Sequence, residues 1–351
     1  MTDTRIVAVS KSLPPYCRET QEILPYVERW LGEQEPRFRR KVMKIFEGAA
    51  VDKRYSIMEA DDVFTETSFE EKNRLYSDAV KELGSDVLRK ALSQAGWEAG
   101  TLDYIITVSC TGIMIPSLDA YLVNDLGMRQ DIIRLPVTEM GCAAGVSGLI
   151  YARNFLRSNP GKRVALVAVE SPTATFQHRD FSMANMVSVA IFGDGAACVL
   201  LSSDVDAKGP RIIGDGMYHF PEATHMMGFD LTNPGLRMIL DPAVPNTINA
   251  HFDDIIHPFL QKNGSGIDKL ERLIFHPGGR KIVQAVEDRF RPLGKNIDDT
   301  RETLRLYGNM SSATVLYVLE RFMKKPAKPG EQGLVLSFGP GFSAQRVLLE
   351  W

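Results

Sequence analysis

The sequence lacks any long hydrophobic run and any strong excess of charge. No apolar segment approaches the ~18 residues that a membrane-spanning helix needs, and the opening segment MTDTRIVAVSKSLPPY holds only a four-residue apolar run after an early acid. We therefore expect neither a membrane span nor a signal peptide. The net charge of −3 offers no overall field for nucleic acid or an anionic membrane, so nucleic-acid partners are not expected.

Cysteine is also scarce. The chain has four cysteines that lie far apart and form no CxxC pair: Cys17, Cys110, Cys142 and Cys198. This spacing argues against a disulfide framework and against the usual zinc sites, so no metal is expected. We expect a cytoplasmic location, because a reducing compartment keeps thiols free, and there a cysteine is either core filler or a working thiol.

Strand and helix patterns alternate along the 351 residues. An i, i+3, i+4 pattern of apolar residues predicts a long helix over 70–96. Continuous apolar segments at 104–110, 132–138 and 163–170 predict strands buried on both faces. The other expected strands are 5–9, 196–202, 211–218, one ending over 273–276, 334–339 and 345–351; the other expected helices are 19–32, 36–47, 143–157, 244–263, 281–290 and 310–325.

These elements predict an α/β fold in which helices cover both faces of a sheet. The chain is too long for one ordinary core, and both of its parts share a strand–turn–helix rhythm, which suggests a duplicated unit. The expected boundary lies near the polar segment DVDAKG at 204–209. We therefore divide the chain into an N-terminal half, residues 1–207, and a C-terminal half, residues 208–351.

Cys142 lies at a junction between a strand and a helix. An apolar strand leads into Gly141, and Ala143, Ala144 and Gly145 follow, which lets the backbone turn sharply and lets a substrate approach closely. A thiol at a helix N-terminus lies near the positive end of the helix dipole, which favours the thiolate. A thiolate attacks thioesters readily, so Cys142 is a candidate nucleophile rather than a small core residue.

His276 and Asn309 lie at two further junctions of this kind. The segment RLIFHPGG brings His276 to a strand end, where its imidazole is either a hydrogen-bonded core group or a donor to a developing oxyanion. Asn309 follows Gly308 and precedes an expected helix. Its amide either caps that helix or donates a hydrogen bond into a pocket. The three residues together, in the order Cys, His, Asn, are more specific than any one of them.

At these residues the sequence resembles the chalcone and stilbene synthase family, the type III polyketide synthases. The similar segments are MGCAAG at 140–145, IFGDGAA at 191–197, HPGG at 276–279, YGNMSSAT at 307–314 and FGPG at 338–341. They occur in the family's order with compatible spacing, and the resemblance covers nearly the whole chain. It implies the thiolase-like fold, an αβαβα sandwich of two related halves, and a homodimer.

The resemblance also implies a reaction on small CoA thioesters. Cys142 takes an acyl group from an acyl-CoA, and His276 and Asn309 hold the thioester oxygen of malonyl-CoA while it loses CO₂. The resulting enolate attacks the acyl-cysteine, and the cycle repeats before ring closure. Two hydrogen-bond donors suit the negative charge on the enolate oxygen. No metal or redox cofactor is required.

Five residues correspond to cavity positions of the family. Phe192 matches its gatekeeper phenylalanine, and Met238 stands where plant members carry a second one. Cys110 stands where plant members often have threonine. From residue type alone, the phenylalanine and the methionine also suit an ordinary core. The full set of expected cavity residues is Phe192, Cys110, Thr175, Met238 and Ser311.

Two lysines match CoA-binding positions. Lys41 and Lys44 correspond to two of the family's basic residues on an N-terminal helix, but the third basic position aligns with Gly48, so the phosphate site must differ. The segment FRRKVMK equally has the composition of a solvated helix face. A methionine that crosses the dimer interface in plant enzymes aligns with Ile115, which leaves that contact open.

Three functions remain from the sequence. The first is a type III polyketide synthase, for which Cys110, Met238 and the short N-terminus favour a fatty acyl starter and an alkylpyrone or alkylresorcinol product. A malonyl-primed naphthalene-type product is the alternative within this class. The second is a ketoacyl synthase III of fatty acid synthesis, which usually has an HQAN-like segment where this chain has HPGG. The third is a non-catalytic binding protein, against which the intact Cys, His and Asn argue.

Overall fold

A computed structural model describes residues 3–351, and one mixed sheet of nine strands runs through them. The strand order is β11-β12-β13-β8-β1-β7-β6-β4-β5, so the strands before residue 203 and those after residue 210 occupy separate stretches that meet where β1 pairs with β8. β4 pairs in parallel with β5 and β6, and β11 pairs in parallel with β12. The nine strands are β1 (Arg5–Ser12), β4 (Tyr104–Val108), β5 (Ile133–Val137), β6 (Arg163–Glu170), β7 (Gly195–Ser202), β8 (Arg211–His219), β11 (Leu270–Phe275), β12 (Gln332–Gly339) and β13 (Ser343–Glu350).

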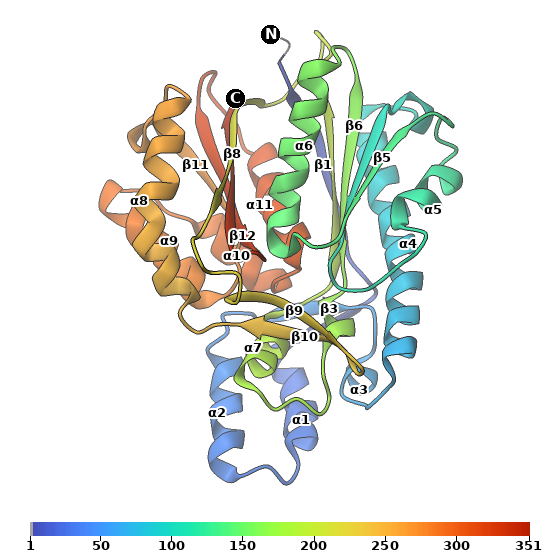
Figure 1. The fold of residues 1–351 in the computed structure, drawn as a ribbon, viewed down its shortest axis with the longest axis vertical. Coiled ribbons are helices and arrows are strands. Elements are labelled where there is room, and N and C mark those ends of the chain that lie inside the picture. Colours follow the sequence, from blue (N-terminus) through green and yellow to red (C-terminus); the bar gives the residue numbers. More distant parts are fainter. Residues whose placement is uncertain (1–2) are drawn as a thin grey trace.

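Helices sort into three layers around these strands (Figure 1). α6 (Ala144–Ser158) and α11 (Thr314–Met323) each contact strands from both stretches of the sheet and form the middle layer. α4 (Phe69–Ala95) and α5 (Leu118–Asp125) cover the outer face of the first stretch, and α8 (Val244–Lys262) and α9 (Arg280–Phe290) lie outside the second. The arrangement is the expected α/β fold, an αβαβα sandwich. In the described chain, no helix combines the length and apolar character needed to cross a bilayer.

The helices that cover the site pack at the lower end of the sandwich in Figure 1, opposite the two chain termini. There α1 (Thr20–Leu31) and α2 (Pro36–Glu47) project below α7 (Met183–Ile191), and a hairpin of β9 (Met227–Thr232) and β10 (Gly235–Leu240) crosses in front. A second hairpin joins β2 (Tyr16–Glu19) to β3 (Lys53–Ser56). The remaining helices are α3 (Ala60–Val63) and α10 (Asp298–Tyr307).

Most expected elements are present within a few residues, but one burial prediction was wrong. The segment 132–138 was expected to form a strand buried on both faces, whereas β5 is the edge strand of the sheet and Ile133 is 51% exposed. The reason is that, among residues 3–351, β5 pairs only with β4, so its other edge has no neighbouring strand there. The helix expected from residue 310 begins at Thr314, after a turn in which Ser311 has a φ of +47°.

Candidate active site

The backbone around Cys142 is held by contacts from the second half of the chain. Cys142 lies in a 3₁₀ turn, Gly141–Ala143, directly before α6. Gly141 has a φ of +49°, and a Cβ there would lie 2.5 Å from Cδ of Pro340, so only glycine fits. The hydroxyl of Ser337, on β12, donates a 2.6 Å hydrogen bond to the Cys142 carbonyl. The predicted nucleophile therefore sits on a fixed backbone.

His276 follows directly after β11. Its backbone N–H donates to the Leu336 carbonyl at 2.9 Å, which aligns the end of the strand, and the Gly278 N–H closes the turn onto the His276 carbonyl at 3.0 Å. The side chain is buried, and neither ring nitrogen has a hydrogen-bond partner among the described residues. An unpaired buried imidazole is costly for a purely structural residue, so this one is available to a ligand.

The two ends of the Asn309 amide have different surroundings. Its Oδ1 accepts a 2.9 Å hydrogen bond from the Ser311 backbone N–H and a 3.3 Å bond from the Thr314 hydroxyl. These contacts stabilise the turn before α11 and fix which end of the amide is oxygen. The Nδ2 group is left with one long contact, 3.4 Å to the Gly278 carbonyl. A donor is thereby directed towards the turn that follows His276.

The three residues meet in one cavity, here called the catalytic cavity. It encloses about 650 Å³ together with its opening, and Cys142, His276 and Asn309 all line it. Four of the five expected cavity residues line it too: Cys110, Phe192, Met238 and Ser311. The fifth, Thr175, lies outside this lining, with its hydroxyl donating to the Pro172 carbonyl at 2.8 Å.

Burial shifts the pKa values of the thiol and the imidazole in opposite directions. Desolvation raises the pKa of Cys142 to about 11, against a weaker opposing effect of its contact with the Ser311 hydroxyl, and it lowers the pKa of His276 to about 3. Near neutral pH, Cys142 is thus a neutral thiol and His276 a neutral imidazole. The expected stabilisation of a thiolate by the helix terminus is outweighed by the loss of water.

This resting state predicts a pH dependence of cysteine alkylation. Because the Cys142 pKa lies near 11, its thiolate fraction grows with each step in pH below that value. We expect iodoacetamide to alkylate the unliganded protein about tenfold faster per pH unit between roughly pH 6 and 9. Mass spectrometry of the Cys142 peptide gives the rate. A rate independent of pH over this range would instead indicate a preformed thiolate–imidazolium pair.

Glu170 is a site residue that the sequence analysis missed. Its buried carboxylate accepts hydrogen bonds from the Cys110 backbone N–H at 3.0 Å, the Thr111 hydroxyl at 2.8 Å and the Ser312 hydroxyl at 2.5 Å. It therefore joins the loop after β4 to the turn before α11. The clue in the sequence is a single acid that ends the otherwise apolar segment RVALVAV.

Ser311 stands between two thiols. Its hydroxyl lies 3.3 Å from the Cys110 sulfur and 3.7 Å from the Cys142 sulfur. Burial raises the pKa of the Cys110 thiol well above its usual range, and the nearby Glu170 carboxylate adds to this shift. Cys110 is therefore a neutral thiol in the wall of the catalytic cavity and is not expected to act as a second nucleophile.

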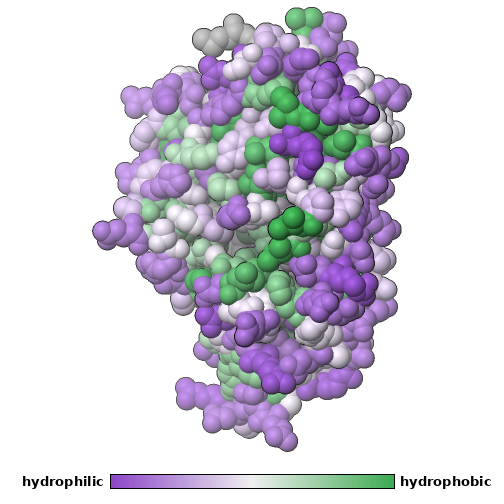
Figure 2. Space-filling view, turned by 45° about the vertical axis from the view of Figure 1, so that its right-hand side comes forward, coloured by the Kyte–Doolittle hydropathy of each residue, from purple (hydrophilic) through white to green (hydrophobic). Residues whose placement is uncertain are grey.

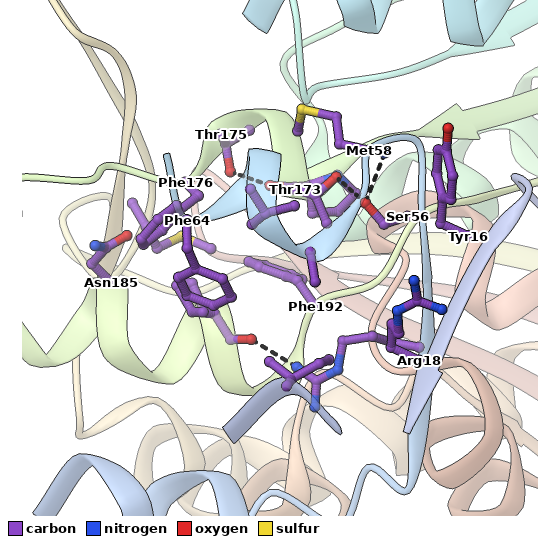
Figure 3. Close-up of a pocket in the computed structure, with 18 residues that line it drawn as sticks. Tyr16, Arg18, Ser56, Met58, Phe64, Thr173, Thr175, Phe176, Asn185 and Phe192 are labelled. Carbon is purple, nitrogen blue, oxygen red and sulfur yellow. Dashed lines mark hydrogen bonds between the residues drawn. The ribbon is translucent and has the colours of Figure 1, made fainter. Parts of the chain in front are cut away.

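A second cavity adjoins the catalytic cavity and shares two lining residues with it, Phe192 and Met238. It encloses about 720 Å³ with its opening, and Thr175 lies in its wall. In Figure 3 the Phe192 ring lies among the labelled side chains, with Phe64 and Phe176 on one side and Tyr16 and Arg18 on the other. The other apolar lining residues are Ile23, Met58, Ala60, Val63, Pro172 and Val189.

Lys41 and Lys44 lie outside both cavities, on the exposed face of α2. Gly48, where the third basic residue was missing, ends this helix, and its carbonyl accepts a 3.3 Å hydrogen bond from the Arg280 guanidinium. Arg280 is the first residue of α9, four positions after His276. A cation from another part of the chain therefore stands at the position of the missing one.

The whole chain is similar to one protein family. The family model "Chalcone and stilbene synthases, N-terminal domain" matches residues 2–205, and the model of the C-terminal domain matches residues 216–350. A 1,3,6,8-tetrahydroxynaphthalene synthase from Streptomyces peucetius subsp. caesius is 33% identical, over 99% of this chain and 93% of that protein. A phloroglucinol synthase from Pseudomonas fluorescens is 28% identical, over 94% of each chain.

Solved structures agree with these matches. The crystal structure of a 1,3,6,8-tetrahydroxynaphthalene synthase from Streptomyces coelicolor, described as a bacterial type III polyketide synthase, superposes with a TM-score of 0.93 at 28% identity and covers 99% of both chains. The fold, the two matched domains and the arrangement of Cys142, His276 and Asn309 point the same way. The chain belongs to the chalcone and stilbene synthases, the type III polyketide synthases, which are acyltransferases that catalyse decarboxylating Claisen condensations.

Proposed function

We propose that this enzyme takes a fatty acyl group from an acyl-CoA, extends it with malonyl-CoA and closes the product to a pyrone or resorcinol. The observation that carries the proposal is the second cavity. Its wall is mainly apolar, and it borders the catalytic cavity at only Phe192 and Met238, so an acyl chain on Cys142 can extend past these two side chains. Burial of each methylene there contributes about 0.8 kcal/mol.

Loading begins with the neutral thiol. As the acyl-CoA binds, the Cys142 proton passes to the unpaired His276 imidazole, and the thiolate attacks the thioester carbon. The Cys142 thiolate and the His276 imidazolium attract each other strongly in a cavity of low dielectric constant. This attraction offsets the desolvation that favours the neutral form of each group. The imidazolium then returns the proton to the departing CoA thiolate.

Extension uses the two donors. An N–H of His276 and the Nδ2 of Asn309 bind the thioester oxygen of malonyl-CoA, where negative charge grows as the carboxylate leaves as CO₂. Both groups are held by their backbone contacts before the substrate arrives, so little reorganisation is needed. The enolate carbon then bonds to the acyl carbon on Cys142, and the bond from that carbon to the Cys142 sulfur breaks. The extended chain is left on CoA, and Cys142 is released as a thiolate that can take it up again. The proposed cycle uses no metal or redox cofactor.

The phosphates of CoA fit the cations at the end of α2. Lys41, Lys44 and Arg280 are exposed, and within residues 3–351 none of them forms an ion pair. Arg280 lies between Gly278 of the turn and Ile282 of α9, both of which line the catalytic cavity. We assign these three cations to CoA, with Arg280 in place of the residue absent at Gly48.

A panel of starters tests the proposal. The purified enzyme is incubated with malonyl-CoA and acyl-CoAs from acetyl to stearoyl, and products are read by mass spectrometry. We expect pyrones or resorcinols from medium or long starters. Ser188 lines the second cavity from α7, so Ser188→Phe should fill it and lower turnover of long starters about tenfold or more, while acetyl-CoA serves as the internal control.

A malonyl-primed enzyme is the second candidate, because the relatives named above are tetrahydroxynaphthalene and phloroglucinol synthases. Formation of a naphthalene-type product from malonyl-CoA alone, unaffected by added fatty acyl-CoA and by Ser188→Phe, would favour this candidate and contradict the fatty acyl starter.

We also propose a homodimer formed along β5. In the described part of the chain no strand pairs with the outer side of β5. Ile133 of this strand is exposed, and so are Ile113 and Ile115 in the loop between β4 and α5. Figure 2 turns the side of α5 and β5 forward and shows apolar side chains gathered around the centre of that face. Light scattering should give about twice the monomer mass of 39.1 kDa. The cytoplasmic location and the boundary at 207/208 stay predictions.

A further inference from the structure

One face of α2 carries a line of cations that continues onto α9. Arg37, Arg40, Lys41 and Lys44 are exposed and lie three or four residues apart, so they share one side of the helix. Arg280 extends the line at Gly48. We call these five residues the basic stripe. From Arg37 to Gly48 the helix rises about 16 Å.

The basic stripe has no acidic partners. In the described part of the chain no carboxylate lies within ion-pair distance of any of its five cations, although the other charged surfaces form many such pairs. Within residues 3–351 the single acid of α2, Glu47, forms no ion pair with them either. Clustered cations repel one another, and the chain as a whole is slightly acidic, so a concentration of one sign points to an anionic partner.

The stripe also has a defined relation to the catalytic cavity. Its Arg280 end borders the turn after His276, and α2 packs against α7, which lines both cavities. Its Arg37 end is the N-terminal end of α2, in the projection that α1 and α2 form at the bottom of Figure 1. The phosphates of CoA are assigned to Lys41, Lys44 and Arg280 at the near end of the stripe. Arg37 and Arg40 then have no role in CoA binding.

We propose that the basic stripe docks an acidic acyl carrier protein, so that the enzyme can load its starter from a protein-bound thioester as well as from CoA. The inference rests on the proposed function, because it supplies the same acyl group to the same cysteine. A carrier protein presents a negative surface beside the phosphopantetheine arm that carries the acyl thioester. Pairing that surface with the stripe directs the arm towards the catalytic cavity.

The chemistry is an exchange of one thioester for another. The Cys142 sulfur forms a bond to the acyl carbon, and the bond from that carbon to the pantetheine sulfur breaks. The proton that Cys142 gave to His276 returns to the departing pantetheine thiol, so no further reactant is needed.

An anionic membrane fits the stripe less well. A helix that lies on a bilayer inserts an apolar face, but the apolar face of α2 is already buried in the core through Val42 and Phe46, with Phe38 packed against it. The acidic surface of a folded protein, by contrast, can bind the exposed cations without any insertion of apolar side chains.

The experiment compares two donors of one acyl group. Octanoyl transfer to the enzyme is followed by intact mass, from octanoyl-CoA and from a purified bacterial octanoyl-acyl carrier protein, for wild type and for the double variant Arg37→Glu/Arg40→Glu. The matched control is Lys208→Glu/Lys328→Glu, which makes the same charge change at exposed positions. Lys208 precedes Gly209, which bonds to Arg5, and Lys328 lies two residues before Gly330, which bonds to Trp351, so both belong to the end of the molecule that carries the termini.

We expect the wild type to load from both donors. The stripe variant should lose about tenfold or more in kcat/KM for the carrier protein and keep its value for octanoyl-CoA within about twofold, and added salt should slow only the carrier reaction strongly. The control variant should resemble the wild type.

Loading from CoA with none from the carrier protein would overturn the inference and leave the proposed function intact. Equal losses for both donors in the stripe variant would do the same, because the stripe would then serve CoA alone. Loading from neither donor would remove the proposed function as well. Stripe-dependent sedimentation with phosphatidylglycerol vesicles, without carrier loading, would assign the stripe to a membrane instead.

Discussion

Replacing Cys142 with alanine is expected to abolish covalent acylation and to lower condensation by roughly three orders of magnitude or more. The remaining groups can still bind substrates, but no other thiol in the catalytic cavity can take over. Incubation with octanoyl-CoA followed by intact mass should show one added acyl group on the wild type and none on the variant.

The matched control is Cys110→Ala. This thiol lines the same cavity, but burial raises its pKa and it contacts the Ser311 hydroxyl, so its loss should leave the acyl adduct in place. An adduct on the Cys142→Ala protein, or loss of the adduct in Cys110→Ala, would contradict the assignment of the nucleophile.

Asn309→Asp is expected to reduce decarboxylation of malonyl-CoA about 10²- to 10³-fold while acyl loading changes only a few-fold. The carboxylate keeps an oxygen for the Ser311 N–H, so the turn before α11 is preserved, but it replaces the Nδ2 donor with an oxygen that repels the enolate. Release of CO₂ measures decarboxylation, and intact mass measures loading.

Asn309→Ala distinguishes the amide donor from the amide oxygen that holds the turn before α11. It removes both the donor and the acceptor, so we expect the same loss of decarboxylation together with about 1 kcal/mol lower stability, seen in thermal melting. If loading and decarboxylation fell equally in Asn309→Asp, the amide would not be specific to the enolate-forming step.

Local patterns predicted most of the scaffold. The long helix α4 follows from apolar spacing, and the buried strands β4 and β6 follow from continuous apolar runs. β5 was misjudged because an apolar run does not reveal whether a strand lies inside a sheet or at its edge. The hairpin of β9 and β10 was not predicted, although the β9 sequence MGFDLT alternates apolar and polar residues as a half-buried strand does.

The predicted catalytic residues meet because each lies at a strand–helix junction on the same side of the sandwich. The sequence could not show which other groups join them. Glu170 and Ser337 act through contacts between residues more than 140 positions apart, and Arg280 reaches Gly48 across 232 positions. The pKa of Cys142 was misjudged for a related reason, since desolvation depends on the whole cavity and the helix dipole only on local structure.

The hydrogen bond from Ser337 to the Cys142 carbonyl ties the nucleophile of one half to a strand of the other. Cys142 belongs to the N-terminal half of the chain, whereas His276 and Asn309 belong to the C-terminal half. A shift of one half relative to the other would therefore disturb the alignment of the three catalytic residues. On heating, enzymatic activity should therefore be lost at a lower temperature than helical content. A substitution at the contact between the two halves can therefore abolish catalysis while all three catalytic side chains remain unchanged.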